Sequence, residues 1–101
     1  MTGAPILVRV GGQTWRATPD RPWTIGRAEE ADVHLDNPRI SRSQATLEFT
    51  PDGWVLVNHS RNGMFVGGSR VERLALQGPA TVYLGSPSEG VILHLHPKRP
   101  R

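Results

Sequence analysis

The amino-acid sequence predicts an all-β domain, and three observations lead to that prediction. Short apolar and β-branched runs recur along the whole chain, with the alternation typical of strands. The eleven glycines and nine prolines fall mostly between these runs, where turns are needed. The one stretch with helical character, Ala28–Ala31, is long enough for a single turn. Because no strand–helix alternation occurs, an antiparallel sandwich is favoured over a parallel doubly wound sheet.

About ten short strands are expected, separated by recognisable turns. Gly11-Gly12 suits a tight first hairpin, because glycine adopts positive φ without strain. Pro51-Asp52-Gly53 is a good β-turn sequence between two of the longer runs. The expected strands are Pro5–Val10, Gln13–Thr18, Trp23–Arg27, Val33–Leu35, Gln44–Thr50, Trp54–His59, Met64–Val66, Ser69–Val71, Ala80–Leu84 and Val91–His96.

The 101 residues suit one small domain, which we place at residues 5–96, with 97–101 as a basic tail or the start of a linker. The net charge of +3 comes entirely from Lys98, Arg99 and Arg101, so residues 1–97 are formally neutral. Eleven of the twelve basic residues are arginine. A neutral body with selected arginines indicates a local anion site and argues against a nucleic-acid partner that needs a broad basic face.

Several functional classes fit the sequence poorly. Cysteine is absent, so disulfide frameworks and zinc-thiolate sites are excluded. No apolar run approaches a membrane span and no secretory signal pattern opens the chain, so we expect a cytoplasmic location without membrane insertion. We expect no cofactor and no metal, and interpret the acidic group Glu29, Glu30 and Asp32 as a solvated loop. No nucleophile–base pair or carboxylate pair stands out, so the chain is not expected to be an enzyme.

Three expected loops are rich in polar donors: residues 26–27, 39–42 and 58–63. Arginine forks, a serine hydroxyl and loop amides are the groups that bind a tetrahedral dianion. An asparagine carboxamide can bond both the donor and the acceptor of an extended peptide backbone. These loops therefore point to an anionic, peptide-like ligand.

In these loops the chain resembles the forkhead-associated domain family, whose members bind phosphothreonine peptides. The resemblance rests on Thr-Ile-Gly-Arg at 24–27, Ile-Ser-Arg-Ser-Gln-Ala at 40–45 and Asn-His-Ser-Arg-Asn-Gly-Met-Phe-Val at 58–66. It extends over almost the whole chain, from about Pro5 to His96. It implies a sandwich of about eleven strands whose apical loops hold the ligand.

The resemblance also implies roles for individual residues. Arg27 and Ser41 would contact the phosphate, and Arg42 and Arg61 would join them. Asn62 would hydrogen-bond the peptide main chain beside the phosphothreonine.

Other positions would set specificity or support the loops. Arg39 lies where the third residue after the phosphothreonine would be recognised, so an acidic or polar residue is expected there. The residues expected to support the loops structurally are Gly26, Gln44, Ser60 and Gly63.

The chain departs from the family pattern at two places. Gln44 stands where a buried histidine is usual, and glutamine keeps a donor and an acceptor for bracing the loops. Gly67-Gly68 stands where Asn-Gly is usual, which removes one side-chain contact.

The sequence thus predicts a non-enzymatic module that binds a phosphothreonine segment in another protein or in its own longer chain. Its arginine, glycine and proline content suggests a bacterial source and a Ser/Thr kinase as the enzyme that modifies the partner. Two alternatives stay open. Gln44 and Gly67 favour a phosphate-independent scaffold, and a weaker hypothesis is nucleic-acid binding through the arginines and the tail, which predicts strong salt dependence.

Overall fold

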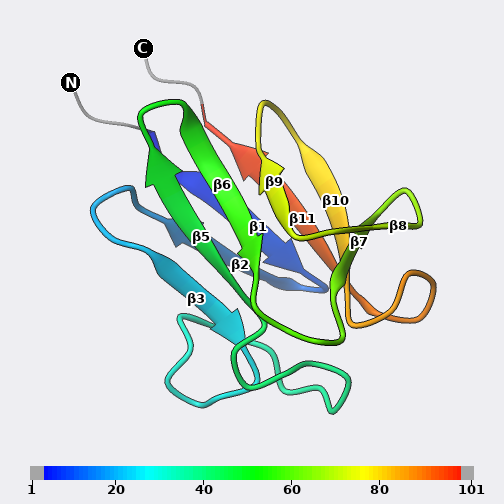
Figure 1. Cartoon of the computed structure of the whole chain (residues 1–101). Coiled ribbons are helices and arrows are strands. Elements are labelled where there is room, and N and C mark those ends of the chain that lie inside the picture. The colour runs from blue at the N-terminus through cyan, green and yellow to red at the C-terminus, as the bar shows by residue number, and fades with distance from the viewer. Residues whose placement is uncertain (1–3, 99–101) are drawn as a thin grey trace.

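In a computed structural model, which describes residues 4–98, eleven strands form two sheets that pack face to face (Figure 1). The six-stranded sheet has the order β2-β1-β11-β10-β7-β8, and the five-stranded sheet has the order β4-β3-β5-β6-β9. The strands are β1 Ile6–Val10, β2 Gln13–Ala17, β3 Trp23–Gly26, β4 Val33–His34, β5 Ala45–Thr50, β6 Gly53–Asn58, β7 Met64–Val66, β8 Ser69–Val71, β9 Arg73–Ala75, β10 Ala80–Leu84 and β11 Val91–Pro97.

The core lies between the two sheets and is built mainly by alternation along the strands, although Trp54, Val55 and Leu56 of β6 are buried in succession. Val8 of β1 faces inward beside Leu95 of β11, and both side chains are fully buried. Leu47 of β5 and Leu56 of β6 pair in the opposite sheet and are also fully buried. Each such side chain contributes about 1.5–3 kcal/mol by leaving water. The core therefore fixes the strand register, and with it the positions of the loops.

The all-β prediction is confirmed, and ten of the strands lie where the sequence placed them within a residue or two. One strand was missed, β9, because no glycine or proline separates it from β8. The chain passes from one sheet to the other at Glu72, so a run that looks continuous is two strands. Another difference is that β4 pairs with β3 in parallel, within otherwise antiparallel sheets.

The predicted turn at Ala28–Ala31 is present, and the Ala31 amide donates to the Ala28 carbonyl at 3.0 Å. Across residues 4–98 there is no helix that is long and apolar enough to cross a membrane. The expected basic tail lies partly outside the described residues, at 99–101. Within them, β11 continues to Pro97 and the Lys98 amide donates to the Pro5 carbonyl at 2.9 Å.

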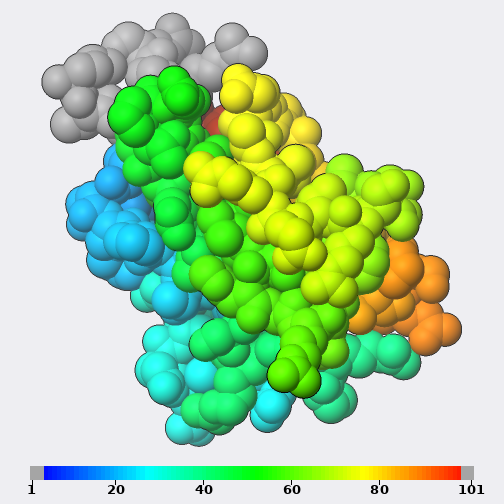
Figure 2. All heavy atoms as spheres, viewed as in Figure 1, coloured from blue at the N-terminus to red at the C-terminus, as the bar shows by residue number. Residues whose placement is uncertain are grey.

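Four connections meet at the end of the sandwich opposite to Pro5 and Lys98 (Figure 1). They are the β3–β4, β4–β5, β6–β7 and β10–β11 loops. Figure 2 shows the cyan and green segments of the first three loops closing this end side by side. The fold thereby brings the polar segments of the sequence together.

Candidate functional site

The β3–β4 and β4–β5 loops are joined through their backbones. The Arg27 amide donates to the Ser41 carbonyl at 3.0 Å, and the Ala28 amide donates to the Arg42 carbonyl at 3.3 Å. Gly26 permits this approach, because a Cβ at that position would lie 2.0 Å from the Arg42 carbonyl oxygen. Any side chain at residue 26 would therefore push the two loops apart.

The Arg27 side chain is held by one hydrogen bond. Its Nε donates to the Ile40 carbonyl at 3.0 Å in a partly buried position. Among residues 4–98, no hydrogen bond or ion pair occupies its two terminal guanidinium nitrogens. The guanidinium is thus fixed at one nitrogen and retains the two-nitrogen edge that binds an oxyanion.

Ser41 and Ser60 connect the β4–β5 loop to the β6–β7 loop. Their hydroxyl oxygens lie 2.5 Å apart, and the Ser60 oxygen also accepts the Asn62 amide at 3.0 Å. Ser60 is buried, whereas Ser41 is half-buried. Each hydroxyl carries one hydrogen and the contact uses one of the two, so one hydroxyl hydrogen of the pair remains for a ligand, and Ser41 is the more exposed residue.

Gln44 is fully buried and bridges the same two loops. Its Oε1 accepts the Ser41 amide at 3.0 Å, and its Nε2 donates to the Gly63 carbonyl at 3.1 Å. Its backbone also pairs with Ile25 and His59. A glutamine can satisfy both partners at once because it carries a donor and an acceptor.

Asn62 reaches across to the β4–β5 loop. Its Nδ2 donates to the Arg39 carbonyl at 3.1 Å. Its Oδ1 accepts no hydrogen bond within residues 4–98, and the residue is exposed. The carboxamide is therefore oriented by the protein and offers a free oxygen to an incoming N–H group.

Three residues that the sequence analysis did not single out hold the β6–β7 loop. Arg70 donates to the Arg61 carbonyl at 3.1 Å, and Asn58 donates to the Ser60 carbonyl at 2.9 Å. Glu72 accepts from both, at 2.9 Å from Asn58 and 2.7 Å from Arg70. The hydrogen bond from Asn58, followed by that from Arg70, lowers the pKa of Glu72 below its usual value.

The sequence did not predict this network, because it depends on where the β7–β8 pairing places Arg70 and where the crossover to β9 places Glu72.

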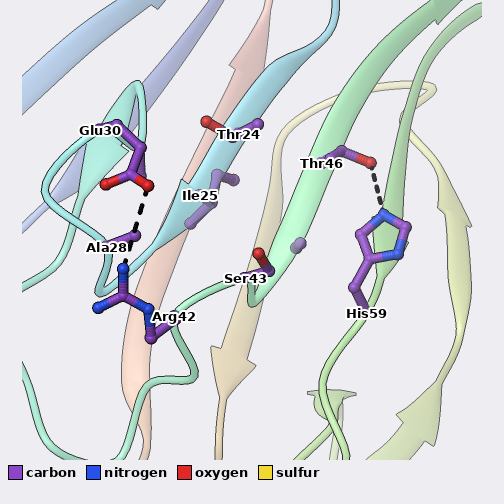
Figure 3. Close-up of a pocket in the computed structure, with 10 residues that line it drawn as sticks. Thr24, Ile25, Ala28, Glu30, Arg42, Ser43, Thr46 and His59 are labelled. Atoms are coloured by element: carbon purple, nitrogen blue, oxygen red, sulfur yellow. Dashed lines mark hydrogen bonds and ion pairs between the residues drawn. The ribbon is translucent and has the colours of Figure 1, made fainter.

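Arg42 and Arg61 lie at the rim of the site. Figure 3 shows Arg42 turned across Ala28 toward Glu30, and the ion-pair distance is 4.0 Å. Arg42 also borders a mixed polar and apolar groove of about 400 Å³ over β3 and β5. The Arg61 side chain is exposed, and within residues 4–98 the hydrogen bond to Arg61 is accepted by its backbone carbonyl, not made by its side chain. The protein bonds thus preorganise Arg27, Ser41 and Asn62, but not these two arginines.

Acidic side chains share a hollow with two of the site arginines, Arg27 and Arg42. A hollow of about 370 Å³ is lined by Arg27 and Arg42 together with Glu29, Glu30, His34 and Asp36. Asp32 points elsewhere and bonds to Arg21 and Thr24. No three His, Asp or Glu residues within 4–98 are arranged to hold a metal ion.

A fourth loop, β10–β11, borders the predicted specificity residue. Glu89 lies 3.3 Å from Arg39 as an exposed ion pair. The loop is docked by the Gly85 amide, which donates to the Gly63 carbonyl at 2.9 Å. The Glu89 amide in turn donates to the Ser86 hydroxyl at 3.1 Å. Glu89 could not be predicted as a site residue, because nothing in its local sequence marks it as a neighbour of residue 39.

Known proteins are similar to this chain in sequence and in architecture. The family profile of the FHA domain matches residues 23–85. The ABC transporter ATP-binding/permease protein Rv1747 of Mycobacterium tuberculosis is 32% identical over 85 residues, which cover 82% of this chain and 10% of that protein. The chain therefore spans about a tenth of the length of this curated relative.

Solved structures of FHA domains have the same fold as this chain. The FHA-1 domain of Mycobacterium tuberculosis Rv1747 superposes with a TM-score of 0.91 at 26% identity, covering 97% of this chain and all of that one (100%). An FHA domain solved in work on phosphothreonine-dependent FHA interactions has a TM-score of 0.80 at 19% identity, covering 96% and 99% of the two chains. The profile match covers more than half of the chain and includes the Gly-Arg, Ser-Arg and Asn-Gly segments of the site, so the chain belongs to the forkhead-associated (FHA) domain family.

Proposed function

We propose that this domain binds phosphothreonine-containing segments of proteins through its apical loops, as a non-enzymatic interaction module. The segment belongs either to a partner protein or to a longer chain that includes this domain. The binding unit is residues 5–96. The observation that carries the proposal is the arrangement of Arg27. Its guanidinium is anchored at Nε by the Ile40 carbonyl and keeps its outer edge for an anion, and its backbone amide is bonded to the Ser41 carbonyl.

A phosphothreonine side chain matches these groups. It brings close to two negative charges and three acceptor oxygens at neutral pH. Arg27 supplies a charged fork and Ser41 a hydroxyl, and Arg42 and Arg61 swing in from the rim. The ion pair between Arg42 and Glu30 is long and exposed, so it is weak. Arg42 would leave Glu30 and bind the phosphate instead.

The peptide backbone is recognised beside the phosphate. Asn62 is already oriented by the Arg39 carbonyl, and its Oδ1 would accept a backbone N–H of the ligand. Each charge-assisted hydrogen bond contributes about 1.5–3 kcal/mol net. After the cost of ordering a peptide, we expect a dissociation constant of about 1 µM, roughly −8 kcal/mol.

The proposal extends to the kinase and the compartment, the first from the phosphothreonine and the second from the composition of the chain. A Ser/Thr kinase must supply the phosphothreonine, and we place the interaction in the cytoplasm of a bacterium. The relative Rv1747 is an ABC transporter ATP-binding/permease protein, and its FHA-1 domain is part of that chain.

Titration with a degenerate phosphothreonine peptide library tests the proposal, with phosphoserine and unphosphorylated libraries measured in parallel. Selective binding of phosphothreonine is expected. Arg27→Ala should weaken this binding about tenfold to a hundredfold, as the loss of one charge-assisted contact implies. Arg73→Ala is the matched control, because Arg73 is an exposed arginine on β9 with no ion pair within residues 4–98.

Equal binding of phosphorylated and unphosphorylated peptides would contradict the proposal and support a phosphate-independent scaffold.

A further inference from the structure

The outer face of the six-stranded sheet has an unusual charge pattern. None of its six strands contains an aspartate or a glutamate, although the chain has nine acidic residues. The basic side chains therefore gather there without acidic neighbours on the same strands. Alternation places Arg9, Arg16, His94 and His96 on the outer face, and we call these four residues the basic face.

The register brings the members of the basic face close together. Arg9 of β1 lies directly opposite His94 of β11, and Leu7 lies between Arg16 of β2 and His96 of β11. Directly opposite residues of neighbouring strands have Cβ atoms about 5 Å apart. The four basic side chains thus form two adjacent rows across three strands.

The two arginines of the basic face are unneutralised. No carboxylate of residues 4–98 forms an ion pair with Arg9 or Arg16. Both are exposed. By contrast, Arg70 of the same sheet is neutralised by Glu72 at 2.7 Å. Two permanent positive charges are therefore available to a partner.

Beside the basic face, a row of three apolar side chains crosses the sheet from β11 to β7. Ile92 of β11 pairs with Tyr83 of β10, which pairs with Phe65 of β7. Ile92 is 39% exposed, and the two aromatic residues are half-buried. Protein interfaces are enriched in aromatic residues and arginine and depleted of acidic residues, which is the composition of this face.

We propose that the outer face of the six-stranded sheet is a second interaction surface, which binds an acidic segment of a partner protein carrying apolar side chains between its carboxylates. Charge complementarity identifies the occupant as acidic, and the row from Ile92 to Phe65 requires the apolar side chains. Two arginines are fewer than the phosphate contacts typical of nucleic-acid binding.

This surface is separate from the apical loops. It lies on the flank of the sandwich, whereas the candidate phosphopeptide site lies at the ends of the strands (Figure 1). Both can be occupied at once. A partner that carries a phosphothreonine and an acidic apolar segment would bind more tightly than either part alone, because the second contact forms at high effective concentration.

The test is an NMR titration of the domain with an unphosphorylated peptide of alternating Glu and Leu, beside peptides of alternating Glu and Ser and of alternating Lys and Leu. The Glu-Leu peptide should shift amides of β1, β2 and β11 and leave those of the apical loops unchanged. The Arg9→Gln, Arg16→Gln double variant should weaken this binding about threefold to tenfold. Arg73→Gln, on the other sheet, is the matched charge control and should have no effect.

A second variant separates the apolar contribution. Ile92→Thr keeps a β-branched residue and should weaken binding of the Glu-Leu peptide but not of the Glu-Ser peptide. Thermal unfolding of each variant shows that the fold is retained.

Three results would overturn the inference. They are shifts confined to the apical loops, unchanged affinity in the double arginine variant, and tighter binding to phosphatidylserine vesicles or duplex DNA than to the Glu-Leu peptide. The last would reassign the face to a lipid or nucleic-acid surface.

Discussion

The side-chain oxygen of Gln44 lies 3.0 Å from the backbone nitrogen of Ser41, in the fully buried layer beneath the candidate phosphate site. The other end of the same amide donates to the Gly63 carbonyl at 3.1 Å. This side chain therefore ties the loop that offers Ser41 to the loop that offers Asn62, together with the Ser41–Ser60 contact and the hydrogen bond from Asn62 to Arg39. This is the position at which the family usually has histidine, and the glutamine makes both contacts.

Gln44→Leu should destabilise the domain by about 2 kcal/mol. Leucine fills a similar volume but leaves the Ser41 amide without its partner, whereas the Gly63 carbonyl keeps the Gly85 amide. An unsatisfied buried polar group costs about 1–3 kcal/mol. Denaturant unfolding measures the loss of stability, and phosphopeptide titration should show weaker binding because the buried bridge between the two loops is lost. Gln13→Leu, at an exposed position on β2, is the matched control. Equal stability of the two variants would show that the Gln44 bridge contributes nothing.

The parts of the fold and site that follow local rules could be predicted from the sequence. Gly11-Gly12 and Gly53 mark hairpins because the chain needs positive φ there, and Gly11 and Gly53 have φ of 57° and 118°. The alternation of apolar residues predicted ten of the eleven strands. The roles of Arg27 and Ser41 came from their block pattern and stay predictions.

The parts that depend on long-range placement could not be predicted. Arg70 reaches the β6–β7 loop because β8 pairs with β7, and Glu72 reaches it where the chain changes sheets between β8 and β9. Glu89 meets Arg39 only because the β10–β11 loop docks on Gly63. A single sequence carries no local signal for such contacts between distant segments.

Gly26→Ala should be among the most damaging small substitutions in the chain. The new Cβ would lie 2.0 Å from the Arg42 carbonyl oxygen, so the β3–β4 and β4–β5 loops must separate. We expect a loss of about 3 kcal/mol in unfolding free energy, at the upper end for overpacking, and strongly reduced phosphopeptide affinity. Gly12→Ala is the control, since nothing lies within 4 Å of a Cβ there. Wild-type stability of Gly26→Ala, measured by thermal and denaturant unfolding, would refute the assigned close approach.

Glu89→Gln should change which peptides the domain prefers. Glu89 neutralises Arg39, so an acidic ligand residue beside Arg39 must compete with it. Removing this charge should tighten binding of phosphopeptides with an acidic residue three places after the phosphothreonine by up to about fivefold, the range of an exposed ion pair. Peptides with a neutral residue there should bind as before.

Asp52→Asn removes the same charge in the β5–β6 turn, at the opposite end of the molecule, and should leave the preference unchanged. If Glu89→Gln retains phosphate-dependent binding with no change in preference, Arg39 does not face that ligand residue. If phosphate dependence itself is missing in the wild-type domain, the proposed function fails instead.

Asp32 should make stability depend on pH in the acidic range. Partial burial raises the pKa of Asp32, but hydrogen bonds from Arg21 and Thr24 outweigh this effect, so its pKa lies below the usual value. A carboxylate with a lowered folded-state pKa stabilises the fold above its unfolded pKa of about 3.9 and loses this contribution as the pH falls through the folded value. Asp32→Asn should therefore cost about 1.5 kcal/mol at pH 7, the scale of hydrogen bonds to a charged group.

The difference between wild type and Asp32→Asn should shrink as the pH is lowered below about 4 and disappear when both side chains are neutral. Unfolding free energies measured in urea from pH 7 down to pH 2 check this. Asp36→Asn is the matched control, because no side-chain hydrogen bond or ion pair within residues 4–98 involves the Asp36 carboxylate. A constant difference across the whole pH range would mean that Asp32 acts through packing of the β3–β4 loop and not through its charge.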